Sequence, residues 1–408
     1  MSEWRKITIG DLGKIVTGKT PSTKNENFWN GDIPFVTPSD LQKSKHVFFT
    51  ERTVSQEGLT GVRGQVLPSG AICVSCIGNL GYTAMTTQTS VSNQQINSII
   101  PGADFDKNFV YYLMKSLWDE FKNLEGQSTT LSILNKTLFS KMEVIVPDLS
   151  TQQKIAEVLS SLDDKIELNA QINHNLEEQA KAIFKSWFID APESKAWDSV
   201  PLKELVVAMR NGDWGKDNPC GNNTEVSYCI RGADIPDVNA GNKGKMPIRY
   251  ILPKNYEKKH LVEGDIVVEI SGGSPTQSTG RCAVISQALL DRYEQKIVCT
   301  NFCKALKPLD GYSHFLYYYW TYLYEKGCFF AYENGTTGIK NLDIAGIIEN
   351  EFLQLPPIEI MEKFNELCDK VASTIFSNGT ETERLAQLRD ALLPKLMSGE
   401  IDVSEVEI

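Results

Sequence analysis

The chain has 408 residues, 41% of them hydrophobic, so it is long enough to bury more than one hydrophobic core. It contains no run of about 18 apolar residues, and its N-terminal MSEWRKITIG lacks a signal-peptide pattern. The sequence therefore excludes a membrane-spanning helix and predicts a cytoplasmic protein. The net charge of −11 argues, at first sight, against a nucleic-acid partner.

The acidic charge is confined to two segments. Residues 148–198 hold 10 acids and 5 bases, and residues 359–408 hold 11 acids and 5 bases. The rest of the chain is balanced, with 31 of each. Basic faces on the balanced segments remain compatible with nucleic-acid binding, and the clusters Lys43/Lys45, Lys243/Lys245/Arg249 and Lys254/Lys258/Lys259 suggest such faces.

The first segment, residues 1–147, is expected to be rich in strands. Short β-branched runs alternate with Gly, Pro, Asn and Ser, and an aromatic helix is expected at about 108–123. Cys73 and Cys76 form a CxxC, a spacing found in zinc and redox sites. Because AICVSCIG has the pattern of a buried strand, we expect both cysteines to be core residues.

Residues 148–190 are predicted to form one long helix, from about 151 to 189. Ser150 with Gln153 resembles a capping box, and Pro192 lies just beyond the expected end. Alternating steps of four and three residues give a heptad stripe that is polar at its centre. Its members are Ile155, Leu159, Leu162, Ile166, Asn169, Asn173, Leu176, Ala180, Ile183 and Trp187.

Residues 191–356 repeat the first segment in order. WRKITIGDL matches WDSVPLKEL, IPFVTPSDL matches SYCIRGADI, and PSGAICVSCIG matches VEGDIVVEISG. FVYYLMKS then matches FLYYYWTY, and STTLSIL matches TTGIKNL. Each match is weak, but five in the same order indicate two copies of one strand-rich unit.

Residues 357–408 repeat the long helix. Adding 209 to the first stripe gives a second stripe that is again mostly apolar and is polar at the same central positions, with Asn378 matching Asn169. Asn378-Gly379 is a helix-stop signal, and Thr380 with Glu383 resembles a new cap. We therefore expect this helix to break near 377–380, and Pro394 to interrupt its last turns.

The predicted fold class is α+β. Two pseudo-repeated strand-rich domains are separated by two long helices, which pair as an antiparallel coiled coil and give pseudo-two-fold symmetry overall. A helix of 39 residues would be about 58 Å long. Two domains held apart by such a spacer suit duplex DNA, where sites on one face recur about every 34 Å.

The chain resembles the specificity subunits of type I restriction-modification systems (the HsdS family). The segments that carry the resemblance are IPFVTPSDL, SGAICVSCIG, EGDIVVEISG, STTLSIL, TTGIKNL and, most specifically, VPDLSTQQKIAEVLSSLDDKI with its helical continuation. The second copy of this last segment, around IEIMEKF, lacks the glutamines. A weaker cap or a different partner contact is therefore expected there.

The resemblance implies a function and a set of partners. Residues 1–147 and 191–356 would be target-recognition domains, each reading one half of an asymmetric bipartite site in double-stranded DNA. Residues 148–190 and 357–408 would set the unread spacer and dock two adenine-methylating modification subunits. The chain itself would bind no cofactor, since S-adenosylmethionine belongs to those subunits. The resemblance also implies that such a complex can recruit motor-nuclease restriction subunits.

Candidate DNA contacts follow from residue chemistry, because Lys and Arg bind phosphates while Asn, Ser, Thr and Arg also read base edges. In the first domain they are Lys19, Thr20, Ser22, Lys24, Arg63, Ser128 and Thr129. In the second they are Arg210, Asn211, Arg231, Arg281, Thr336, Thr337 and Lys340. The residues expected to pack the spacer helices are Ile155, Leu159, Leu162, Ile166, Leu176, Ile183, Phe364, Val371, Ile375, Leu385 and Leu392.

No catalytic or metal-binding motif was identified. QLPPIE departs from a methyltransferase tetrad, GGSPTQSTGR lacks the phosphate-loop Lys, and the four histidines have no paired ligand spacing. We therefore expect a non-catalytic subunit without a metal. Two alternatives stay open at this point: a coiled-coil adaptor that does not bind DNA, and an enzyme with an unrecognised catalytic site.

Overall fold

The computed structural model of the protein describes residues 4–42, 44–126, 132–272, 277–335 and 340–403. The chain folds into two compact units. Unit 1 comprises residues 1–167 and 384–408, and unit 2 comprises residues 168–383. Each unit therefore combines a strand-rich domain with a segment of each of the two long helices.

Unit 1 contains a five-stranded sheet, a smaller sheet and a terminal strand pair. The large sheet has the order β2-β9-β6-β7-β4, with β2 (Gly13–Thr17), β9 (Ile96–Pro101), β6 (Ile72–Ser75), β7 (Thr83–Thr86) and β4 (His46–Val47). The small sheet has the order β5-β3-β8, with β5 (Thr53–Val54), β3 (Trp29–Val36) and β8 (Val91–Ser92). β1 (Arg5–Thr8) pairs antiparallel with β10 (Glu143–Val146), which leads into the first long helix.

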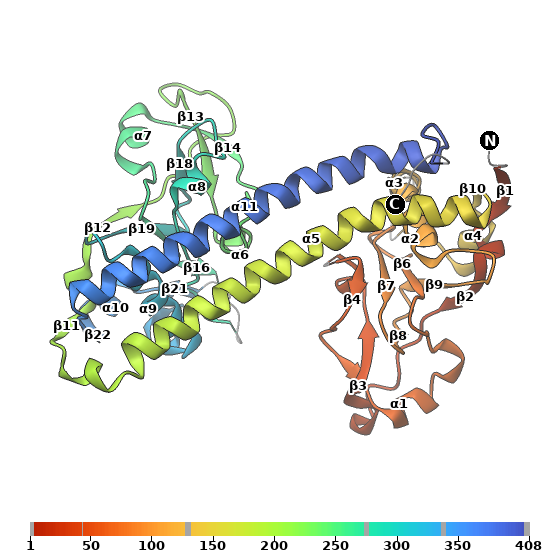
Figure 1. Ribbon diagram of the computed structural model, residues 1–408, viewed down its shortest axis with the longest axis horizontal. Helices are drawn as coiled ribbons and strands as arrows, with labels where there is room; N and C mark the ends of the chain where they lie inside the picture. The colour runs from red at the N-terminus through yellow and green to blue at the C-terminus, as the bar shows by residue number, and fades with distance from the viewer. Residues whose placement is uncertain (1–3, 43, 127–131, 273–276, 336–339, 404–408) are drawn as a thin grey trace. The chain divides into compact units, whose positions relative to one another are not determined.

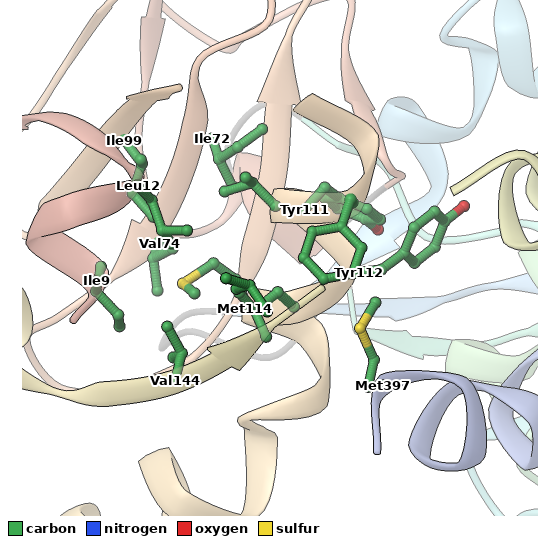
Figure 2. Close-up of a cluster of buried hydrophobic side chains, with 14 of the residues drawn as sticks. Ile9, Leu12, Ile72, Val74, Ile99, Tyr111, Tyr112, Met114, Val144 and Met397 are labelled. Carbon is green, nitrogen blue, oxygen red and sulfur yellow. The ribbon is translucent and has the colours of Figure 1, made fainter. Parts of the chain in front are cut away.

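The core of unit 1 forms where the large sheet meets helices. The helices of this core are α2 (Lys107–Ser116), α3 (Trp118–Gly126), α4 (Lys136–Lys141), the start of α5 (Leu149–Phe184) and the end of α11 (Ile358–Met397), whereas α1 (Gln56–Thr60) packs against the small sheet. In Figure 1 the large sheet lies against α2, and the small sheet lies farther from α5. Figure 2 shows the core side chains, with Ile72 and Val74 of β6 facing the α2 residues Tyr111, Tyr112 and Met114.

The two cysteines of the CxxC are core residues, as predicted. Cys73 is fully buried in β6, and Cys76 follows that strand with 2% of its surface exposed. Burial raises the pKa of the Cys73 thiol to about 11 and that of Cys76 to about 12. Both are thus held in the unreactive thiol form.

Unit 2 repeats the strand pattern. Its four-stranded sheet has the order β12-β19-β15-β17, with β12 (Val206–Asn211), β19 (Cys303–Pro308), β15 (Ile266–Glu269) and β17 (Cys282–Val284). A second sheet contains β14 (Ile248–Ile251), β13 (Glu225–Ile230) and β18 (Ile297–Cys299). A third contains β16 (Ser271–Gly272), β21 (Lys340–Leu342) and β20 (Glu333–Asn334), and β11 (Ser199–Pro201) pairs antiparallel with β22 (Phe352–Gln354).

The helices of unit 2 pack against both its main sheet and its second sheet. They are α6 (Ile235–Asn239), α7 (Pro253–Lys259), α8 (Gln287–Leu290), α9 (Ser313–Glu325), α10 (Ile344–Asn350) and most of α11 (Ile358–Met397). The fully buried Phe364 of α11 contacts Phe184 of α5 and Tyr318 of α9, with ring centroids 5.9 and 5.6 Å apart. One aromatic core therefore joins the strand-rich domain to both long helices.

The internal repeat extends to the strand register. Equivalent antiparallel pairs are Ile72 with Ile99 in unit 1, and Ile266 with Leu306 in unit 2. Equivalent parallel pairs are Phe35 with Val91, and Cys229 with Val298. One offset relates the first members of these pairs and a second relates their partners, so insertions fall in the loops while the ladders keep their register.

The predicted α+β class and the two long helices are confirmed. Within each unit, segments of α5 and α11 run antiparallel: Asp163 lies beside Arg389 in unit 1, and Asn173 beside Asn378 in unit 2. None of the predicted packing residues is exposed. Ile155, Leu159, Phe364 and Ile375 are buried, and Leu162, Ile166, Leu176, Ile183, Val371, Leu385 and Leu392 are half-buried.

The predicted break near 377–380 is wrong, because α11 is continuous from Ile358 to Met397 and includes Pro394. Two tertiary contacts and one bond within the helix account for the three residues that suggested a stop. Asn378 donates a hydrogen bond across to Asn173, and the Thr380 hydroxyl bonds back to the Phe376 carbonyl. Gly379 lies where a side chain would collide with Gly241. Asn378 and Gly379 therefore serve packing against other segments, Thr380 bonds within the helix, and none of the three ends it.

Two further details of α5 correct the sequence analysis. Asp148 caps the helix by accepting a 3.0 Å bond from the Thr151 N–H, which lowers the pKa of Asp148, while Ser150 lies inside the first turn. After Phe184 the helix widens into a π-helical turn, Lys185–Ile189. The wider turn changes the helical phase, so Phe188 is buried where Trp187 was expected, and Trp187 is 37% exposed. No described helix is both long and apolar enough to span a membrane.

Candidate nucleic-acid interface

The first candidate surface in unit 1 is the loop that follows β2. Gly18 begins this loop in contact with the backbone of the β8–β9 turn, at a distance that leaves no room for a Cβ atom. The Thr20 hydroxyl then bonds to the Gln94 side chain across the same turn at 2.8 Å. These two contacts hold the loop on the edge of the sheet, so its polar side chains are presented from a fixed base.

The predicted residues of this loop point to solvent. Lys19, Ser22 and Lys24 are exposed, and the carbonyl of Ser22 accepts a 3.1 Å hydrogen bond from the Trp29 indole. Arg63, in a short 3-10 helix after α1, is also exposed. Among the described residues, none of these three cations makes an ion pair. Ser128 and Thr129 lie outside the described residues.

The predicted cations of unit 2 have a different environment, because each pairs with a carboxylate of the same unit. Arg210 bonds to the buried Asp265, and Arg231 bonds through two nitrogens to the buried Asp234 at 2.9 Å. Arg281 donates hydrogen bonds from two nitrogens to Glu269 at 2.9 and 2.8 Å, and Lys340 pairs with Glu333 at 2.7 Å. Asn211 is exposed, and Thr336 and Thr337 lie outside the described residues.

These pairs are reflected in the direction of several pKa shifts. Burial acts to raise the pKa of Asp234, but hydrogen bonds from Arg231 and from the Lys245 N–H outweigh it and lower the value. Burial raises the pKa of Asp265, since the bonds from Val262 and Arg210 offset it only in part. The bond to Glu269 raises the pKa of Arg281. Removing any one of these cations would leave a buried carboxylate without its partner.

Two basic clusters suggested by the sequence do not form simple surface patches. Lys45 is 6% exposed, and its ammonium group bonds to Ser160 of α5 at 3.0 Å. Arg249 is 5% exposed and pairs with Asp217 while its guanidinium stacks on Trp214. Lys45 and Arg249 therefore do not belong to basic surfaces, because their long stems are buried, whereas Lys245 of the second cluster is exposed. Lys43 lies outside the described residues.

Comparison with known families decides the class of the protein. Residues 1–178 and 194–388 match the family model described as the type I restriction modification DNA specificity domain. The chain belongs to this family. The two matched stretches begin near the start of each structural repeat.

Individual relatives agree with the family. The type I restriction enzyme MjaIX specificity subunit of Methanocaldococcus jannaschii is 29% identical over 424 residues, covering 99% of this chain and 95% of that protein. The type I restriction enzyme HindI specificity subunit of Haemophilus influenzae is 34% identical over 177 residues, covering 43% of this chain and 39% of that protein. The solved S subunit of a type I restriction-modification system from M. genitalium has a TM-score of 0.55 at 16% identity, covers 97% and 96% of the two chains, and supports the fold.

The structure adds residues of this specificity subunit that sequence reasoning missed. In unit 1, the Tyr112 hydroxyl of α2 donates to Asp163 of α5 at 2.6 Å, and Arg389 of α11 donates to the same carboxylate at 2.7 Å. In unit 2, Tyr317 and Tyr318 of α9 both donate to Glu177 of α5. The adjacent tyrosines in FVYYLMKS and FLYYYWTY were the available signal, since buried hydroxyls need partners.

The first glutamine of the Gln152-Gln153 pair also has a structural role. Gln152 is fully buried; its side-chain oxygen accepts from the Asp106 N–H at 3.1 Å, and its amide donates to the Pro147 carbonyl at 3.0 Å. Met361, at the equivalent position of α11, is also fully buried. The polar clamp of unit 1 is therefore an apolar contact in unit 2.

Proposed function

We propose that this chain is the subunit of a type I restriction-modification complex that reads a bipartite DNA sequence. Residues 1–147 and 191–356 each read one half-site as target-recognition domains, and the helical segments 148–190 and 357–408 set the unread spacer. The observation that carries the proposal is the match of the family model to both halves of the chain. The strand ladders that recur in the same register give each half the same platform.

The loops on this shared platform favour an asymmetric target. At corresponding positions after the glycine that follows β2 or β12, unit 1 has Lys19 and Thr20, whereas unit 2 has Asp213 and Trp214. Phe302 of unit 2, which is 62% exposed, takes the place of the polar Gln95. Side chains with such different hydrogen-bonding groups recognise different base edges, so the two half-sites should differ in sequence.

The proposed phosphate contacts of unit 1 are Lys19, Lys24 and Arg63, which are exposed and without an ion pair among the described residues. Thr20 and Ser22 would support them, and Ser128 and Thr129 remain candidates. In unit 2 the exposed Asn211 and the half-buried Lys340, with Thr336 and Thr337, keep a direct role, together with the exposed lysines Lys216, Lys245, Lys254 and Lys258. Arg210, Arg231 and Arg281 would act mainly by holding the carboxylates that shape the domain.

The methylation chemistry would reside in the partners. Two modification subunits would dock on the helical segments and supply S-adenosylmethionine and the adenine-methylating site, while this chain supplies sequence selection. Restriction subunits with motor and nuclease activity would join the same assembly. The acidic charge of residues 148–198 and 359–408 suits protein partners better than DNA.

The test is to co-express the chain with its modification subunit and map methylated adenines in cellular DNA by single-molecule sequencing. The expected result is one asymmetric motif with two specified halves and a constant unread spacer. DNA without any chain-dependent motif would contradict the proposal and favour the adaptor. Methyl transfer by the purified chain alone, given S-adenosylmethionine and DNA, would favour the enzyme.

A variant measurement tests the proposed contacts. Lys19, Lys24 and Arg63 changed together to Gln should weaken DNA binding and reduce the slope of log Kd against log salt concentration by about 2.7, at ~0.9 per lost phosphate contact. The matched control changes the exposed Lys136 and Lys141 of α4 to Gln, and should leave the slope unchanged. Equal slopes in the triple variant and the wild type would refute these contacts.

A further inference from the structure

A buried polar layer interrupts the apolar packing of α5 against α11 in unit 2. Asn169 and Asn173 of α5 are only 1% and 4% exposed. Asn173 donates to the Ile375 carbonyl of α11 at 3.0 Å and accepts from the Asn378 side chain at 2.8 Å. Asn169 donates to Glu381 at 2.8 Å, one turn further along α11. These bonds join specific residues of the two helices, whereas apolar contacts do not distinguish one register from the next.

The recognition domain of unit 2 docks on the same layer. Asn173 also donates to the carbonyl of Ala240, in the turn that follows α6, at 3.0 Å. The next residue of that turn, Gly241, packs on Gly379 so closely that a Cβ atom on Gly379 would lie 2.5 Å from the Gly241 carbonyl carbon. Figure 1 shows α6 beside α11 at this place.

An arginine holds the docked turn in place. Arg292 donates to the Gly241 carbonyl at 2.6 Å and to Glu383 of α11 at 2.9 Å. One side chain therefore connects the turn to the helix one turn beyond Gly379. Asn173 takes part both in the docking of the domain, through Ala240, and in the pairing of α5 with α11, through Ile375 and Asn378, while Gly379 fixes where the turn meets α11.

The layer is not arranged for stability alone. The side-chain oxygen of Asn169 is buried and has no hydrogen-bond partner among the described residues. An unpaired buried acceptor destabilises a fold, and a polar residue in a helix seam is known to select one register at a cost in stability. Ile166 and Leu176, the seam residues on either side of the two asparagines, are apolar and have no side-chain hydrogen-bonding group that could be left unpaired.

We propose that Asn169, Asn173, Asn378 and Gly379 form a register lock that sets the number of unread base pairs between the two half-sites. This inference rests on the proposed function. Both helices continue along the chain into unit 1, so a register change in unit 2 requires the helix segments of unit 1 to change partners too. A slip of one heptad moves one helix by about 10 Å along the other, which is about three base pairs.

The test replaces the lock by apolar residues and reads the spacer. The triple variant Asn169→Leu, Asn173→Leu and Asn378→Leu is co-expressed with the modification subunit, and methylated adenines are mapped by single-molecule sequencing. We expect both half-sites to be retained, with methylation at two or more spacer lengths where the wild type uses one.

Controls separate this inference from the proposed function. Asn175→Leu, at an exposed position of the same helix, should keep the single wild-type spacer. If the wild-type protein directs methylation to no bipartite DNA motif, the proposed function itself is contradicted. If the wild type methylates a bipartite motif and the folded triple variant methylates the same motif with the same single spacer, the register lock is overturned while the proposed function stands.

If the triple variant is not folded by circular dichroism and gel filtration, the single variant Asn173→Leu decides. It removes the bonds to Ile375 and Ala240 while keeping Asn169 and Asn378. Methylation at additional spacer lengths supports the lock. A folded Asn173→Leu protein that methylates only the wild-type spacer overturns it.

Discussion

Gly379→Ala is a change for which helix propensity and tertiary packing predict opposite effects on the free energy of unfolding: propensity predicts stabilisation and packing predicts destabilisation. In an exposed helix interior this change stabilises by about 1 kcal/mol, because Ala is the better helix former. In α11 the new methyl group would lie 2.5 Å from the Gly241 carbonyl carbon and closer still to its oxygen. The obstruction is backbone, so it cannot be relieved by rotating a side chain, and the 240–241 turn has to move.

The expected magnitude follows from the bonds made by that turn. Displacing it weakens the bonds from Asn173 to Ala240 and from Arg292 to Gly241, which contribute roughly 1 and 2 kcal/mol. Overpacking adds about 1 kcal/mol or more. After the propensity gain of about 1 kcal/mol is subtracted, we expect a net destabilisation of about 2–3 kcal/mol.

Urea denaturation combined with site-resolved hydrogen exchange measures this change. Exchange should accelerate in residues 239–242 and in α11 around residue 379. The matched control is Ser377→Ala, at an exposed position in the same turn of α11, which should stabilise by about 0.5 kcal/mol. Gly379→Ala as stable as Ser377→Ala would show that the turn does not depend on close contact with the helix.

Two further variants examine the junctions of the helices with the strand-rich domains. Gln152→Met, which installs the residue found at the equivalent position of α11, should destabilise unit 1 by about 1–3 kcal/mol, because the Asp106 N–H and the Pro147 carbonyl lose their partner. Thermal denaturation should show no comparable loss for the exposed Gln153→Met, and equal melting temperatures for the two would contradict the clamp. Burial raises the pKa of Glu177 despite the nearby Lys181, so its favourable contribution is present below the ordinary glutamate pKa of about 4.3 and is lost as the pH rises through the folded value. Glu177→Gln should therefore gain stability relative to the wild type between pH 4 and pH 7, and a difference that does not change with pH would refute the sign.

Much of the architecture was predictable because it depends on local patterns. Alternating β-branched runs predicted the strands, and the repeated order of five segments predicted two domains with matching ladders. The apolar stripes predicted which faces of α5 and α11 are buried, and the AICVSCIG pattern predicted buried cysteines. In each case the signal is the spacing of apolar residues, which can be read from the sequence without knowledge of the fold.

The candidate site was less predictable, because a cation in the sequence does not show which carboxylate it will meet. Arg210 and Lys19 are both basic residues near the end of equivalent strands, yet Arg210 pairs with Asp265, a residue 55 positions away, and Lys19 is exposed. Likewise, Lys45 was expected on a basic surface but is buried beside Ser160. These differences depend on contacts between distant segments.

The sequence by itself determined the repeat, the α+β class, the family resemblance and the two long amphipathic helices, since these follow from composition, periodicity and order along the chain. Only the tertiary structure decided how the Asn378-Gly379-Thr380 segment is used. Read locally, it is a helix stop; in the fold, Asn378 bonds to Asn173 and Gly379 admits the Gly241 backbone, so the helix continues. The physical reason is that packing against a neighbouring helix and turn outweighs a local preference of about 1 kcal/mol.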